Sequence, residues 1–268
     1  MDWITGDKFK SLGVNFAPEK KQPGDYDGLV NSFSVINEIN YVYSHTIYVS
    51  ELIETIKDID AVFVLITHNG DVNVNINVPD NVLIWWTQNV ASEDPRMQSI
   101  PIGLENDRWF KEVKKKEKML AKMQEPHNEL TGNLVYMNFN VGTNTAKRLQ
   151  PYRTFKDKSW VTVNMGCNGQ RFDEYLDGIY NHKFVICPEG NGMDTHRTWE
   201  CLYMGSIPIE KINTNNKFYA DLPICFVEDW EQVTENFLEK EYIRINNLIW
   251  NHSKLGFEYW KEKINASE

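Results

Sequence analysis

The chain has 268 residues, 25% of them charged, and a formal net charge of −10. A chain of this length can form one large domain or two of about 100 to 150 residues, and its aromatic-rich composition excludes an intrinsically disordered protein. The acidic balance excludes a general nucleic-acid binder, because such a protein needs a basic face to neutralise phosphates.

The first residues, MDWITGDKFKSLG, lack a basic region followed by an apolar one, and no window approaches the ~18 apolar residues that span a bilayer. We therefore expect a soluble, cytoplasmic protein without membrane insertion. The cysteines have no C-x-x-C spacing and lie in or beside apolar runs, so we expect buried free thiols, with two disulfides or a metal site as the alternatives. They are Cys167, Cys187, Cys201 and Cys225.

The N-terminal part predicts a buried parallel strand that ends in polar residues. Alternating side chains predict a strand over residues 41–49, and helical spacing predicts a helix over residues 50–59. The run Ala61 to Thr67 is apolar throughout, as expected of a strand covered on both faces, and HNGD follows it. Chemistry in α/β proteins lies at such strand ends. His68 and Asp71 are the groups there that can take a proton.

Two further segments complete the N-terminal part. VLIWW, residues 82–86, predicts a strand whose tryptophans belong to the core or offer a ring face to a ligand. Residues 107–123 predict a helix with a lysine-rich side, which is either solvated or a contact surface for an acidic partner. EPHNELTGN, residues 125–133, breaks all periodicity. We place a domain boundary there, after residue 128.

The next segment predicts a strand, a polar loop and a helix N-terminus between residues 134 and 155. Thr143 or Asn144 can cap a helix that carries Lys147, Arg148 and, beyond Pro151, Arg153. Because proline lacks an N–H and disrupts a helix interior, we expect Pro151 to shorten this helix. The sequence leaves open which of the three cations meets a phosphate. This unit resembles the first βα unit of GT-B donor domains, and on that resemblance Arg148 is the one that we favour. A strand over residues 160–165 and a helix over residues 172–180 follow.

Residues 183–210, KFVICPEGNGMDTHRTWECLYMGSIPIE, again predict strand, loop, helix and strand. Gly190 and Gly192 allow close approach of the backbone to a ligand, and Asp194 or Thr195 can cap the helix, whose free N–H groups favour an anion. On that helix His196 and Arg197 lie four and three residues before Glu200, so a base and an acid share a face. A simple helix ion pair between Arg197 and Glu200 is the alternative.

This segment resembles the donor-binding segment of exostosin-family glycosyltransferases, in which a P-x-G…D-x-x-R-x-x-E-x-x-x-x-G-x-I-P pattern recurs. WWTQN and IPIGLEN, at residues 85–89 and 100–106, are similar to a segment of small exostosin-like glycosyltransferases. The residues that match the first pattern are Pro188, Gly190, Asp194, Arg197, Glu200 and the sequence GSIPI at 205–209.

The resemblance implies an α/β fold with two Rossmann-like domains in a GT-B arrangement. Residues 1–128 would form an acceptor-side domain and residues 129–250 a nucleotide-sugar-binding domain. The last forty residues read as two helices, and residues 251–268 would form a helix that crosses back to the N-terminal domain.

The implied activity is transfer of a sugar from a nucleotide-diphosphate sugar to a hydroxyl of an oligosaccharide or glycan acceptor, with inversion. Arg197 would bind phosphate and Glu200 ribose or sugar hydroxyls. The predicted donor-binding residues are Arg148, Gly190, Asn191, Gly192, Asp194, Thr195, Arg197 and Glu200.

His68 or Asp71 is the predicted catalytic base, with Glu105 and Asp107 next in order. No cofactor and no obligatory metal are expected, since Asp58-Ile59-Asp60 precedes the buried strand and so lies at its wrong end. The P-loop, dinucleotide, nucleophile-elbow and H-E-x-x-H motifs are absent from the sequence. A non-catalytic carbohydrate- or nucleotide-binding module and a different nucleotide-dependent enzyme are the alternatives.

Overall fold

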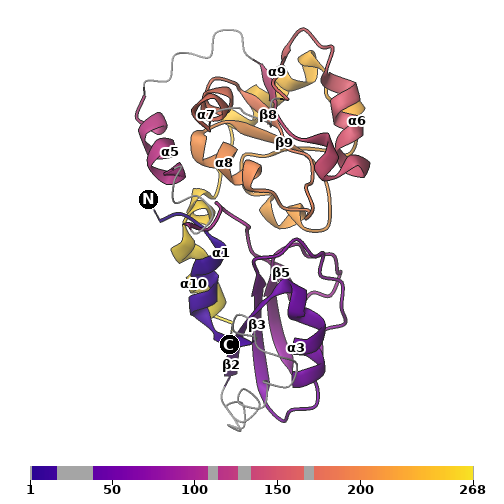
Figure 1. Cartoon of the computed structure of the whole chain (residues 1–268), viewed down its shortest axis with the longest axis vertical. Helices are drawn as coiled ribbons and strands as arrows, with labels where there is room; N and C mark the ends of the chain where they lie inside the picture. The colour runs from indigo at the N-terminus through magenta and orange to yellow at the C-terminus, as the bar shows by residue number, and fades with distance from the viewer. Residues whose placement is uncertain (1, 17–38, 108–113, 126–133, 166–171, 268) are drawn as a thin grey trace.

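The computed structural model describes residues 2–16, 39–107, 114–125, 134–165 and 172–267. Figure 1 shows two lobes stacked along the long axis. The lower one is formed by the N-terminal part of the chain together with residues 257–265, and the upper one by the C-terminal part together with residues 115–123. The domain boundary predicted after residue 128 lies outside the described residues. Within the described ranges, no helix is long and apolar enough to cross a membrane.

The N-terminal half contains a five-stranded parallel sheet whose strands follow chain order. The central strand β3 is buried along almost its whole length, which explains its uninterrupted apolar sequence. The strands are β1 (Val14–Phe16), β2 (Ile39–His45), β3 (Val62–His68), β4 (Val82–Thr87) and β5 (Met97–Ser99).

The C-terminal half contains a second five-stranded parallel sheet, in the order β10-β9-β8-β6-β7. The chain leaves β6 toward β7 on one side and returns to β8 on the other, so the topological switch point lies between β6 and β8. Ligands of open α/β sheets bind at the carboxyl ends of the strands at such a point. The strands are β6 (Val135–Met137), β7 (Val161–Val163), β8 (Phe184–Ile186), β9 (Ile207–Lys211) and β10 (Cys225–Val227).

Helices connect the strands and link the two halves (Figure 1). Short 3-10 turns lie at residues 10–12, 46–48, 141–143, 216–219, 230–232 and 252–255. The α-helices are α1 (Gly6–Phe9), α3 (Val49–Ile56), α5 (Lys115–Met123), α6 (Thr145–Phe155), α7 (Phe172–Tyr180), α8 (His196–Met204), α9 (Glu235–Asn246) and α10 (Phe257–Asn265). The mixed α/β class with parallel sheets is therefore confirmed, and it is compatible with two Rossmann-like domains.

The C-terminal helix α10 contacts the N-terminal half. The Phe257 ring lies 5.2 Å from that of Phe9 in an edge-to-face arrangement, and Trp86 Nε1 donates to the hydroxyl of Ser267 at 2.9 Å. Figure 1 shows α10 beside α1. One core cluster correspondingly contains buried residues of both halves, whereas two others each belong to one sheet.

Helix α6 corrects the prediction made from Pro151. The helix runs through this proline to Phe155 instead of ending before it. Pro151 is buried, so burial of its ring offsets part of the cost of the missing backbone hydrogen bond. Arg148 lies in the first turn of this helix and is buried, on the same side as Pro151 and Phe155.

Three cysteines are buried free thiols, as predicted. Cys187, Cys201 and Cys225 form no disulfide, although the sulfur atoms of Cys187 and Cys201 lie 3.9 Å apart. Cys167 lies outside the described residues.

Candidate functional site

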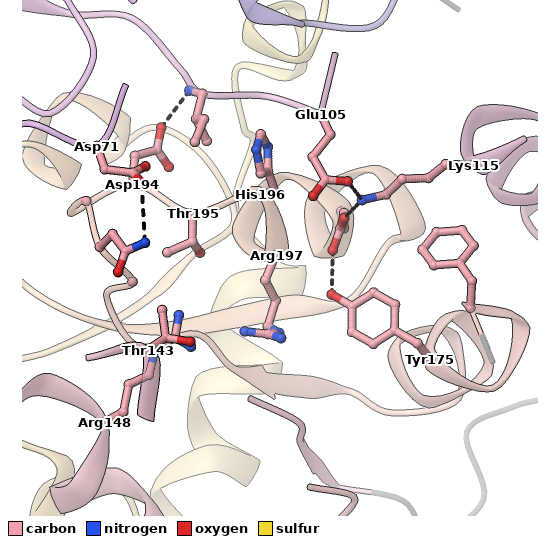
Figure 2. A pocket seen from close by; sticks show the side chains of 16 residues that line it. Asp71, Glu105, Lys115, Thr143, Arg148, Tyr175, Asp194, Thr195, His196 and Arg197 are labelled. Atoms are coloured by element: carbon pink, nitrogen blue, oxygen red, sulfur yellow. Dashed lines mark hydrogen bonds and ion pairs between the residues drawn. The ribbon is translucent and has the colours of Figure 1, made fainter. Parts of the chain in front are cut away.

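A cavity of about 370 Å³ lies between the two halves, at the carboxyl ends of strands from both sheets. Thr143 and Arg148 reach it after β6 and the loop at residues 190–195 reaches it after β8, so its C-terminal wall is the topological switch point. Asp71 after β3, and Ile102 and Glu105 after β5, form the opposite wall. Figure 2 shows side chains from both walls converging on one space.

The loop between β8 and α8 is held by hydrogen bonds to its backbone. Gly190 N–H donates to Gly192 O at 2.9 Å, and Asn144 Nδ2 donates to Gly190 O at 2.7 Å. A Cβ atom on Gly192 would lie 2.5 Å from Asn89 Nδ2, closer than real Cβ contacts. Gly192 therefore leaves room for Asn89 of the N-terminal half, and it also lines the cavity.

Asp194 joins the two halves through its carboxylate. Its Oδ2 accepts from the Ile102 N–H at 2.7 Å, and the Trp199 indole N–H donates to Oδ1 at 2.9 Å. Burial raises the pKa of Asp194 to about 7. The predicted capping arrangement is not found, because Thr195 occupies the N-cap position of α8 while its hydroxyl contacts Thr198 instead of a backbone N–H.

Arg197 is the cation with the least internal compensation in the site. Among the described residues, no hydrogen bond or ion pair to its guanidinium is found, and its buried Nε has no partner. The guanidinium lies over the Tyr175 ring, 5.8 Å from the centroid. Burial opposes the charge, but nearby Tyr175, Cys187 and Glu200 keep the pKa above its usual value. The helix ion pair between Arg197 and Glu200 does not form.

Glu200 instead belongs to a buried cluster with Lys115 and Tyr175. The Lys115 ammonium contacts one carboxylate oxygen and the Tyr175 hydroxyl donates to the other. Lys115 also binds Glu105 of the N-terminal half at 2.8 Å. Burial alone would raise the pKa of Glu200, but Lys115 holds it below its ordinary value. Glu200 is thus an ionised wall residue whose two oxygens already accept from the protein.

Arg148 and Asn191 line the same cavity. Arg148 Nε donates to Glu189 O at 2.9 Å and Nη1 donates to Asn140 O at 3.0 Å, so backbone carbonyls fix the direction of its guanidinium. Its Nη2 lies near Gly190, 3.1 Å from the position of a Cβ there. Asn191 is exposed and donates to Asp71 across the cavity at 3.4 Å.

The two predicted catalytic residues, His68 and Asp71, lie in different environments. His68 is buried: the Asn69 N–H donates to its Nδ1 at 2.7 Å, and its Nε2–H donates to Pro101 O at 3.0 Å. Burial lowers the pKa of His68 to about 4. Asp71 is exposed and lines both the main cavity and an adjoining smaller one of about 180 Å³.

The structure adds site residues that the sequence analysis missed. Lys115 belongs to the lysine-rich helix, for which a solvated face or a partner surface was expected; it is buried and pairs within the protein. The cavity also contains Thr143, Phe172 and Tyr175. No motif in the sequence identifies these residues as part of a site. A sequence signal exists only for Lys115, which belongs to a long basic run and could pair with buried acidic residues.

Neither a metal site nor a known relative helps to assign a function to this cavity. Within the described ranges, no group of three or more His, Cys, Asp or Glu side chains could hold a metal ion. No protein-family model matches this chain, and no curated protein matches it. The resemblance to exostosin-family glycosyltransferases therefore stays a hypothesis carried by the residues around Arg197.

Proposed function

We propose that this protein is a glycosyltransferase of the exostosin-like, GT-B type, which transfers a sugar from a nucleotide-diphosphate sugar to a hydroxyl of a glycan. The observation that carries the proposal is the half-buried guanidinium of Arg197 in a cavity at a topological switch point, because its buried Nε has no hydrogen-bond partner among the described residues. A buried donor without an acceptor is costly, so its retention is best explained by an anionic ligand.

The donor diphosphate would lie against Arg197, with Arg148 and the N-terminus of α8 beside it (Figure 2). Negative charge builds up on the diphosphate as the sugar leaves. A guanidinium and helix N–H groups that are already oriented stabilise that charge more in the transition state than in the ground state. We expect these groups to neutralise the diphosphate without an obligatory metal.

The acceptor would approach from the N-terminal half, where Asp71, Ile102 and Glu105 form the other wall. Its hydroxyl oxygen attacks the anomeric carbon from the face opposite the diphosphate, a new carbon–oxygen bond forms, and the bond to the diphosphate breaks with its electron pair on the leaving oxygen. This in-line geometry inverts the anomeric centre. A protein base must take the hydroxyl proton.

Melting temperature in a panel of nucleoside diphosphates and nucleotide sugars, with and without chelator, tests the donor site. One nucleotide class should raise the melting temperature, because a ligand selective for the folded state stabilises it by mass action. The Arg197→Gln variant should bind this nucleotide about 10-fold or more weakly than the wild type, since a charge-assisted hydrogen bond contributes about 1.5–3 kcal/mol.

Arg153→Gln is the matched control, because Arg153 is an exposed residue of α6 outside the cavity. Its affinity for the same nucleotide should equal that of the wild type. Stabilisation by no nucleotide, or undiminished affinity in Arg197→Gln, would contradict the donor-site assignment. Loss of binding on addition of chelator would contradict metal independence alone.

A further inference from the structure

His196 lies where the two cavities meet. The smaller cavity shares Asp71, Ile102, Glu105 and His196 with the main one, and of these four only the imidazole and the two carboxylates can accept a proton. In Figure 2 His196 extends from α8 toward the N-terminal half, on the opposite side of the helix N-terminus from Arg197. A ligand in the smaller cavity and one beside Arg197 would therefore both approach this ring.

The hydrogen bonding of His196 defines which nitrogen is available. Its Nδ1 lies 2.7 Å from Gly103 O, and a carbonyl can only accept, so Nδ1 carries the proton. The neutral ring therefore has its lone pair on Nε2, for which no partner is found among the described residues. This is the arrangement of an oriented general base, in which a carbonyl fixes the tautomer.

The charges around His196 come from three elements. Glu105 and Glu200 favour its protonated form, whereas Lys115 and burial oppose it; burial is the largest effect, and the pKa of His196 is lowered from its ordinary value. Asp71 and Arg197 line the same cavity. The ring is thus neutral near pH 7 and can accept a proton.

His68 and Asp71 compare less well with this requirement. Both ring nitrogens of His68 are used by the protein, and its ring stacks on Phe9 at 5.1 Å between centroids. Asp71 is exposed on the rim, where water competes for its carboxylate. His196 combines a free lone pair, a fixed orientation and a position between the cavities.

The smaller cavity has the chemistry of a site for hydroxyl groups. Asn69, Gln88 and Asn106 contribute neutral amides to its wall, together with His45 and Glu105. Gln88 is 1% exposed, and its Oε1 has no hydrogen-bond partner among the described residues. A buried acceptor without a donor is a deficit that a ligand hydroxyl can satisfy.

We propose that the smaller cavity binds the acceptor, a neutral polyhydroxylated compound, and that Nε2 of His196 takes the proton of its attacking hydroxyl. The proposal rests on the transfer reaction proposed above. The O–H bond breaks and its proton moves to Nε2, the oxygen bonds to the anomeric carbon, and the bond from that carbon to the diphosphate breaks with its electrons on the diphosphate. Solvent then takes the proton from His196.

The test compares His196→Asn with the wild type. Asparagine keeps a donor near the position of Nδ1–H but has no basic nitrogen. Turnover is measured as nucleoside diphosphate released from the nucleotide sugar that stabilises the wild type best, with a panel of methyl glycosides as acceptors. We expect kcat to fall by about 100-fold or more while nucleotide affinity changes less than about threefold.

His252→Asn is the matched control, because His252 is exposed and lines neither cavity. The wild-type kcat should also decrease below the lowered pKa of His196 as the ring becomes protonated, and this acidic limb should be absent from the residual activity of His196→Asn. Wild-type turnover in His196→Asn, or a loss found in Asp71→Asn or His68→Asn instead, would overturn the assignment of the base.

Gln88→Leu tests the acceptor site itself. It should raise KM for the methyl glycosides by about 10-fold, because a buried hydrogen bond is lost, and leave nucleotide affinity unchanged. Gln98→Leu, outside both cavities, should match the wild type. An unaffected Gln88→Leu would overturn the acceptor site, whereas a wild type that binds nucleotide but turns over no methyl glycoside would contradict the transfer reaction on which this site rests. Absence of nucleotide binding would instead contradict the donor site.

Discussion

The ionisation state of each buried carboxylate in this protein depends on whether a cation contacts it. Glu200 has Lys115 and stays ionised, whereas Glu210 on β9 has neutral partners only, the Thr198 hydroxyl and Asn216 Nδ2. Burial raises the pKa of Glu210 to about 7, and the Asp194 and Glu189 carboxylates add to this rise. Sequence spacing cannot distinguish these two glutamates, because the cation that decides their charge comes from a distant helix.

Glu210→Gln is expected to change how stability depends on pH. The folded pKa of about 7 lies above the unfolded value of about 4.3, so between these values the folded chain holds an extra proton and the free energy of unfolding decreases as pH rises. This contribution is about 4 kcal/mol in total. Glutamine can donate to the Thr198 hydroxyl and accept from Asn216. The variant therefore keeps both hydrogen bonds of residue 210 but lacks this pH dependence of stability.

Urea unfolding at pH 5 and pH 8 measures this effect. Relative to the wild type, the variant should be more stable at pH 8 than it is at pH 5. Equal differences at the two pH values would show that Glu210 is ionised in the folded protein throughout this range.

At the scale of elements, most strands and helices could be predicted from the sequence, but the elements that each of them contacts could not. The limits predicted for residues 172–180 agree with α7, because an apolar stripe of period 3.6 depends on local sequence alone. The function of α5 does not follow from its own sequence. Lys115 bridges Glu105 and Glu200, while Lys118 and Lys122 pair with Asp173 and Asp177 of α7.

Lys115→Met tests the bridging function of α5. Removing the cation leaves the buried Glu200 and the partly buried Glu105 without their partner, and breaking a buried pair costs about 3–5 kcal/mol. We expect a decrease of this order in the free energy of unfolding at pH 7. Near pH 4 the decrease should be smaller, because Glu200 without Lys115 loses the contact that lowers its pKa and is protonated more readily. Denaturant titration at both pH values provides the measurement.

Lys116→Met is the control within the same helix, because Lys116 pairs with an Asp107 side chain that is 78% exposed. Its effect should stay below about 1 kcal/mol. Equal losses in the two variants would mean that α5 contributes through helix formation and not through the Lys115 pairs.

At the scale of the whole molecule, the site depends on contacts between halves that no local pattern contains. The loop after β8 was recognised from its glycines and from Arg197, but its contacts with Asn89 and Ile102 arise only when the two sheets face each other. The same holds for His196, whose bond to Gly103 crosses between the halves. The position of polar loops at strand ends is thus predictable from sequence, whereas the base proposed for the reaction is recognised only in the assembled cavity.

The proposed function depends on transfer of the sugar to an acceptor hydroxyl. The most direct measurement follows by NMR the nucleotide sugar that stabilises the protein best, incubated with methyl glycosides and the wild-type protein. We predict that nucleoside diphosphate appears together with an equal amount of a new glycosidic linkage of inverted configuration. Binding of the nucleotide sugar with no turnover would contradict this prediction and would identify a non-catalytic binding module.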